Sequence, residues 1–132
     1  MPLLKFDLIK GRTEAEISAL LDAAHEAMVE AFDVPVSDRY QSLTQHNPGE
    51  LILRDTGLGY TRSDRAVLLT VISRPQTKAQ KQAFYALLAR RLKETCGLSP
   101  DDLMVSLVEN SDEDWSIPGG CQRMHSEPEC RN

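Results

Sequence analysis

The second residue of the chain is the first candidate for chemistry. Pro2 follows Met1, and the small proline side chain favours removal of the initiator methionine. The mature chain would then begin with a free prolyl amine, which is a base when neutral and an acid when protonated. An amine that is desolvated or placed near cations loses its proton more easily. The plainer interpretation is an ordinary chain terminus, since termini are usually frayed.

Arg74 is the second candidate, because it stands between an apolar run and the helical pattern that follows it. Loops at strand ends often carry ligand contacts. A guanidinium in this position could hold a carboxylate with two parallel hydrogen bonds. The alternative is a solvated loop arginine that contributes little.

Metal and cofactor motifs are missing from the sequence. We find no G-x-G-x-x-G, H-E-x-x-H or C-x-x-C pattern. Cys121, His125 and Cys130 lack a fourth ligand and a regular spacing, so we expect no metal site there. Three scattered cysteines are also no disulfide framework. The sequence therefore predicts chemistry without a metal or an organic cofactor.

Two similar halves can be recognised along the chain. In the first half, a strand pattern at 3–9 is followed by a capping box of Thr13 and Glu16, which predicts a helix over 14–32. In the second half, an apolar strand at 66–73 leads to a capping box of Thr77 and Gln80. The helix of the second half is expected to end at Gly97, and a strand over 103–108 follows it. Two short strands are expected between the halves, at 41–46 and 51–53.

Two βαβ units of this length predict an α/β fold with a four-stranded mixed sheet and both helices on one face. The other face of such a sheet needs cover, most simply from another copy of the chain. The length of 132 residues fits one domain, which we place at residues 1–117, followed by a divergent tail at 118–132.

The composition excludes several classes of function. Twenty acidic residues against fifteen basic ones give a formal charge of −5, which argues against nucleic-acid binding. No apolar stretch is long enough to span a membrane. The N-terminal residues lack the pattern of a signal peptide. We therefore expect a cytoplasmic protein without membrane or nucleic-acid partners.

Several motifs in order along the chain resemble the tautomerase superfamily, and within it the malonate semialdehyde decarboxylase group. They are the opening Pro2–Ile9, Asp38-Arg39-Tyr40-Gln41, Asp55-Thr56-Gly57-Leu58-Gly59, and Asn110-Ser111-x-x-Asp114-Trp115-Ser116. The resemblance covers residues 2–116. It implies a homotrimer with an amino-terminal proline in a pocket near each subunit boundary.

The resemblance also implies a set of site residues. In the decarboxylase group the proline works with an aspartate and two arginines, and Pro2, Asp38 and Arg74 match three of these four. Gln76 stands at the position of the second arginine. Glutamine donates hydrogen bonds but carries no charge for a carboxylate. The resemblance further implies an apolar pocket wall, expected here at Trp115, Ile117 and Met124.

The expected activity is decarboxylation of malonate semialdehyde, or a related 3-oxo acid, to acetaldehyde. The substrate is thus a small carboxylate, and no cofactor is needed. Two alternatives stay open because of Gln76. One is a tautomerase or hydratase that acts on enol acids or unsaturated 2-oxo acids. The other is a trimeric binding module with weak catalysis.

Overall fold

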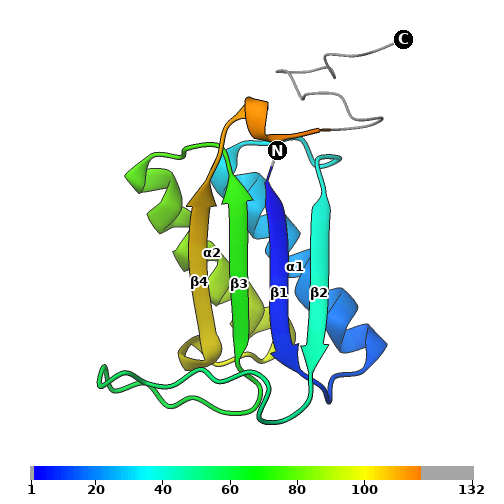
Figure 1. Ribbon diagram of the computed structural model, residues 1–132, viewed down its shortest axis with the longest axis vertical. Helices are drawn as coiled ribbons and strands as arrows, with labels where there is room; N and C mark the ends of the chain where they lie inside the picture. The colour runs from blue at the N-terminus through cyan, green and yellow to red at the C-terminus, as the bar shows by residue number, and fades with distance from the viewer. Residues whose placement is uncertain (1, 117–132) are drawn as a thin grey trace.

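The computed structural model describes residues 2–116 of the chain, so the predicted domain boundary at residue 117 and the tail at 118–132 lie outside the described residues. The elements in chain order are β1 (Leu3–Ile9), α1 (Glu14–Phe32), β2 (Tyr40–His46), β3 (Val67–Ser73), α2 (Lys78–Cys96) and β4 (Leu103–Glu109). Short 3-10 helices, η1 (Pro100–Asp102) and η2 (Asp112–Asp114), flank β4. Each half is a strand, a helix and a strand, as the repeated pattern predicts (Figure 1).

The four strands form one mixed sheet in the order β2-β1-β3-β4. Within each half the strands are parallel, β1 with β2 and β3 with β4. The halves join in the centre, where β1 and β3 run antiparallel and Leu3 lies opposite Ile72. The predicted four-stranded sheet is therefore confirmed, and its central antiparallel pair brings the start of β1 beside the end of β3.

Both helices begin at capping boxes, as the sequence predicts. The hydroxyl of Thr13 accepts a hydrogen bond from the backbone of Glu16, and Thr77 does the same for Gln80, each at 3.1 Å. Each cap satisfies backbone donors that have no partner within the helix. At the other end of α2, Gly97 adopts a left-handed conformation with φ of 66°, which ends the helix as expected.

The hydrophobic core lies between the helices and one face of the sheet (Figure 1). Alternate residues of β1 and β3 point into it, which explains the period-two pattern of both strands. The rings of Phe32 and Phe84 meet across the two helices with centroids 5.0 Å apart. The largest buried aliphatic side chains are Leu4, Leu8, Leu20, Met28, Leu69, Leu88 and Leu92. In the described part of the chain, no helix is long and apolar enough to cross a membrane.

The predicted short strand at 51–53 is wrong. Residues 47–66 form an irregular loop that runs below the sheet and past its β4 edge before it returns to β3 (Figure 1). Gly49 turns the chain with φ of 92°, and Ile52 is 64% exposed. An apolar run without a neighbouring strand edge has nothing to pair with, so it does not become a strand.

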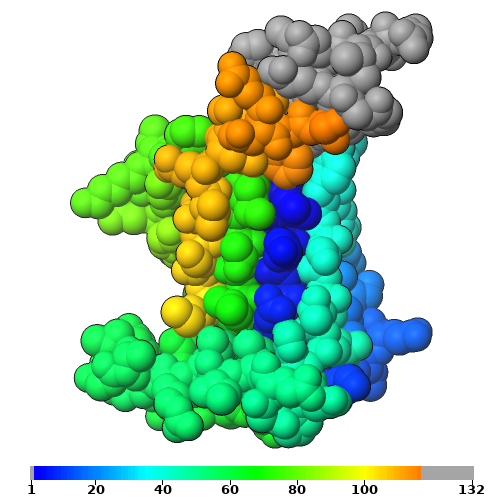
Figure 2. Space-filling view, in the orientation of Figure 1, coloured from blue at the N-terminus to red at the C-terminus, as the bar shows by residue number. Residues whose placement is uncertain are grey.

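Among residues 2–116, no helix covers the second face of the sheet, and Figure 2 views this face directly, between the 47–66 loop and the segment that follows β4. Apolar side chains on this face include Met104 and Val108, which are 44% and 48% exposed. Leu68 and Ile72 of β3 pair with these two residues and share their face. The expected uncovered face is therefore present in the single chain.

Candidate active site

Residues from all four strands meet at one end of the sheet, which we call the proline end. Pro2 directly precedes β1, and Asp38 lies two residues before β2. Leu3 pairs with Tyr40 on one side and with Ile72 on the other. This register places Pro2 next to the loop of Asp38 and to the residues that follow β3. The segment after β4 lies at the same end (Figure 1).

Arg74 enters the proline end directly after β3. Its Nε donates to Oδ1 of Asp112 and its Nη2 donates to Oδ2, both at 2.9 Å. This is a two-pronged ion pair of the kind that fixes a guanidinium in direction. The hydrogen bonds that Arg74 donates to Asp112 raise the pKa of Arg74; burial opposes this, while the charges of Asp112 and Asp38 add to it. Arg74 is therefore a permanent cation, and Asp38 is near enough to act on it electrostatically.

Asp112 is the residue of this site that the sequence prediction misses. It lies in η2, whereas Arg74 follows β3, so 38 positions separate the two. The ends of β3 and β4 are tied together, since the backbone N–H of Asn110 donates to the carbonyl of Ser73 at 2.8 Å. A signal was available in the acidic run 112–114, but nothing local tells which of its carboxylates meets Arg74.

The loop that carries Asp38 is attached to α1 at two points. A ring nitrogen of buried His25 lies 2.7 Å from the carbonyl oxygen of Val36. Arg39 donates to the carboxylate of Asp22 at 2.8 Å. These contacts flank Asp38 on both sides. The helix thereby helps to hold the loop, which also has a hydrogen bond of its own from the backbone N–H of Asp38 to the carbonyl of Pro35 at 2.9 Å.

The remaining predicted residues take different positions. Pro2 is buried, and half-buried Gln76 lies in the turn between β3 and α2. Trp115 follows η2 and is also half-buried. Its Nε1 and the Oδ1 of Asn110 are buried, and neither atom has a hydrogen-bond partner among residues 2–116. A buried polar atom without a partner costs about 1–3 kcal/mol, so a bound molecule or water would stabilise both. Ile117 and Met124 lie outside the described residues.

Metal ligands do not gather at the proline end. Within residues 2–116, no group of three or more His, Cys, Asp or Glu side chains is placed to hold a metal ion. The candidates Cys121, His125 and Cys130 lie outside the described residues. Four of the predicted site residues lie at or beside the proline end, namely Pro2, Asp38, Arg74 and Trp115.

Family models decide the relationship of the chain. Two models described as "Tautomerase enzyme" match it, one over residues 38–118 and the other over residues 2–60. This chain belongs to the tautomerase superfamily. Two tautomerase relatives come from Bacillus subtilis (strain 168). "Probable tautomerase YrdN" is 51% identical over 117 residues, 89% of this chain and 91% of that protein. "Probable tautomerase YusQ" is 30% identical over 94% of this chain and 98% of that protein.

Solved structures place this tautomerase in the malonate semialdehyde decarboxylase group, which confirms the resemblance seen in the sequence. A crystal structure of a malonate semialdehyde decarboxylase is 64% identical, with a TM-score of 0.87, and the match covers 89% of this chain and 92% of that one. That work describes a structural basis for decarboxylase and hydratase activities. FG41 malonate semialdehyde decarboxylase, inhibited by 3-bromopropiolate, is 34% identical, with a TM-score of 0.85. The match covers 89% of this chain and 90% of that one.

More distant structures share the fold alone. Native fused 4-OT is 20% identical, with a TM-score of 0.72, and covers 91% of this chain and 94% of its own. The paired βαβ architecture is therefore common to sequences that differ at most positions. Both strand–helix–strand units pack on one shared core, and many combinations of apolar residues can fill such a core.

Proposed function

We propose that this tautomerase decarboxylates malonate semialdehyde, or a closely related 3-oxo acid, to acetaldehyde and carbon dioxide. The observation that carries the proposal is the meeting of Pro2 and Arg74 at the proline end, in a chain 64% identical to a malonate semialdehyde decarboxylase. Removal of Met1 would give Pro2 a free secondary amine. The substrate would be a small carboxylate, and no cofactor takes part.

The amine and the guanidinium divide the work on the substrate. Protonated Pro2 would donate to the carbonyl oxygen, or neutral Pro2 would attack the carbonyl carbon and form an iminium as the carbonyl oxygen leaves as water. The bond to the carboxylate carbon then breaks, carbon dioxide leaves, and the electron pair forms the double bond of an enol or enamine. Protonation on carbon gives acetaldehyde from the enol, or an iminium that water hydrolyses to acetaldehyde and free Pro2. Arg74, oriented by Asp112, would bind the carboxylate and turn it out of the carbonyl plane.

Asp38 and Trp115 would shape the surroundings of the reaction. Asp38 acts on the charge of Arg74 and could hold hydrogen bonds, keep Pro2 charged or direct a water. The indole of Trp115 supplies an apolar wall, with Ile117 and Met124 proposed beside it. A less hydrated carboxylate loses neutral carbon dioxide more readily.

Gln76 supports a second candidate function. A glutamine cannot supply the second positive charge that a carboxylate would meet in the decarboxylase group. The enzyme would then chiefly tautomerise enol acids or hydrate unsaturated 2-oxo acids. Tautomerisation needs a neutral Pro2 as base, whereas polarisation of a carbonyl needs a protonated one. A proline amine that titrates well below neutral pH in an NMR experiment would favour this alternative, and so would a strong gain of decarboxylation in Gln76→Arg.

A homotrimer is part of the proposal. Relatives with the same fold, such as fused 4-OT, are described as trimers, and the uncovered sheet face of this chain offers an apolar surface for association. The third possibility, a trimeric binding module, is favoured if intact-mass measurement finds Met1 retained. The cytoplasmic location stays a prediction of the sequence.

The decisive experiment follows malonate semialdehyde by proton NMR with the purified protein and with Pro2→Ala and Arg74→Ala. We expect acetaldehyde from the unmodified protein and a loss of at least ~100-fold in both variants. Arg90→Ala, which removes an exposed arginine on α2, is the matched control and should stay active. Acetaldehyde at equal rates from all four proteins would contradict the proposal.

A further inference from the structure

A cavity of about 370 Å³ lies at the end of the sheet opposite the proline end. Arg12, which follows β1, and Arg65, which precedes β3, both line it. The first turns of α1 and the C-terminal end of α2 form its walls. Its volume falls within the range of about 300–1,000 Å³ that is usual for small-molecule sites. Because it is separate from Pro2 and Arg74, the proposed decarboxylation leaves it without a role.

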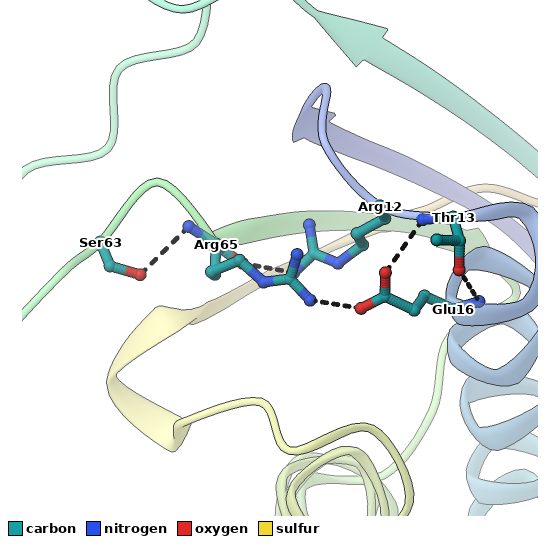
Figure 3. A network of polar contacts seen from close by, with 5 residues as sticks. All are labelled: Arg12, Thr13, Glu16, Ser63 and Arg65. Atoms are coloured by element: carbon teal, nitrogen blue, oxygen red, sulfur yellow. Dashed lines mark hydrogen bonds and ion pairs between the residues drawn. The ribbon is translucent and has the colours of Figure 1, made fainter.

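Within residues 2–116, Arg12 is a half-buried cation that makes no hydrogen bond or ion pair with a carboxylate. Its Nη2 donates to the carbonyl oxygen of Arg65 at 2.6 Å, and its Nη1 has no hydrogen-bond partner among residues 2–116. Figure 3 shows its guanidinium beside that of Arg65. Burial lowers the pKa of Arg12, and the positive charge of Arg65 lowers it further, while the negative charges of Glu16 and Asp102 raise it. An anion bound next to the two guanidinium groups would further offset the cost of burial and of charge repulsion.

The carboxylates nearby are already engaged elsewhere. One oxygen of Glu16 accepts the backbone N–H that caps α1, and the other accepts from Nη2 of Arg65 at 2.8 Å. The carboxylate of Asp102 accepts from the backbone and the hydroxyl of Ser63 at 2.6 and 2.7 Å. Figure 3 shows the Glu16 carboxylate between the guanidinium of Arg65 and the backbone N–H of Thr13, both of which donate hydrogen bonds to it. Arg12 is thus left as a cation that lines a cavity.

The remaining walls of the cavity are largely apolar. Ala15, Ala19 and Leu20 line it from α1, and Cys96 and Leu98 line it from the end of α2. Small side chains on one helix leave room for a ligand, and the aliphatic ones favour a hydrocarbon body. A cavity with a charged group on one side and an apolar wall on the other fits a ligand that has a charged group at one end and a hydrocarbon body at the other.

We propose that this cavity binds a small organic carboxylate, with its carboxyl group on Arg12 and its apolar body against Ala19, Leu20 and Leu98. The carboxylate would supply the hydrogen-bond acceptor that Nη1 of Arg12 lacks within the described residues. Arg65, held by Glu16, adds positive charge beside the carboxyl group. The site needs no residue of the proline end, so it can be tested whether or not the protein is a decarboxylase.

The test compares hexanoate with 1-hexanol, a neutral molecule of the same chain length, in amide NMR titrations of the full chain. We expect hexanoate to give saturable shifts centred on Ala19 and Gly97 and to bind at least ~tenfold more tightly than hexanol, because the bond to a guanidinium is charge-assisted. Equal affinity for the two ligands, or shifts confined to the proline end, would overturn the proposal. This comparison uses the unmodified protein and does not depend on the folding of a variant.

A pair of variants assigns the binding to Arg12. Arg12→Gln should weaken hexanoate binding by ~tenfold or more and leave hexanol binding unchanged. Arg90→Gln removes the same charge from an exposed position of α2 and should leave both affinities as they are. If the two variants weaken hexanoate binding equally, the net charge of the protein explains the affinity, and Arg12 does not form the binding site.

Discussion

Arg74 takes its orientation from Asp112 and not from the turn that carries it. Both bonds of the pair are 2.9 Å long, and 42% of the Arg74 side chain stays exposed. A substrate carboxylate would therefore meet a cation whose direction is already set. Preorganisation of this kind removes part of the entropic cost of binding and alignment. Asp112 would act through Arg74 and is a positioning residue rather than a catalytic one.

Removal of this carboxylate should affect turnover more than substrate affinity. We expect Asp112→Ala to lower kcat/KM for malonate semialdehyde by ~10–100-fold, since a displaced guanidinium no longer aligns the breaking bond. Most of the loss should fall on kcat, because the variant also removes a negative charge that repels the substrate. Steady-state kinetics with separate kcat and KM values check this.

Two further variants sharpen that test. Asp112→Asn keeps one acceptor for Arg74 and should recover part of the rate. Glu113→Ala removes the adjacent exposed carboxylate and should behave as the unmodified protein. If Asp112→Ala raised KM alone, or left the kinetics unchanged, the positioning role would be refuted.

At the level of elements, the two capping boxes form a natural matched pair. The backbone N–H of Thr13 donates to Oε1 of Glu16, and that of Thr77 donates to Oε1 of Gln80, each at 2.9 Å. An amide therefore serves this cap as well as a carboxylate does. What the first helix adds is the charge of Glu16, which also pairs with Arg65 at 2.8 Å.

This difference predicts a pH-dependent contribution from Glu16. The hydrogen bond from the backbone of Thr13 lowers the pKa of Glu16, and the bond from Arg65 lowers it further. A lowered folded-state pKa stabilises the fold above the unfolded value of about 4.3, and this contribution is lost as the pH falls through the folded value. We expect Glu16→Gln to lower the Tm at pH 7 by a few degrees at most, and the gap to close towards pH 3.

Thermal unfolding at both pH values measures that gap. Glu94→Gln removes an exposed carboxylate near the C-terminal end of α2, where a negative charge is unfavourable, so it should not lower the Tm at pH 7. A gap for Glu16→Gln that stayed constant down to pH 3 would mean that the charge of Glu16 is not its cause.

The same elements explain how far the sequence predicts the structure. Strands 3–9 and 66–73 and both helices follow from periodicity and capping, which are local signals. The false strand at 51–53 had the right composition, but pairing depends on a distant edge. Asp112 was missed for a related reason, since its contact with Arg74 arises only when the ends of β3 and β4 are tied together. Local sequence patterns therefore predict the helices and strands, whereas the contacts of the candidate site depend on the register between strands.

In the described part of the molecule, residues 2–116, both long helices lie on one side of the sheet and none lies on the other (Figures 1 and 2). On the core side the inward-facing residues of the central strands β1 and β3 are buried, whereas Met104 and Val108 remain nearly half exposed on the open side. Such a surface is unusual for a monomer and typical of an interface between copies. The proposed trimer would cover it and would bring the proline end of one subunit close to its neighbour.

A charge on the open face should therefore separate the subunits. Light scattering after size-exclusion chromatography should give about 44 kDa for the protein, three times its 14.8 kDa chain. Val108→Glu places a carboxylate on the edge strand β4 of the open face, where burial without a partner is costly, and should shift the mass towards that of one chain. Ala83→Glu adds the same charge on exposed α2 and should stay trimeric. A monomeric unmodified protein would contradict the proposed trimer. A trimeric Val108→Glu variant would show that the subunits associate without burying this part of the open face.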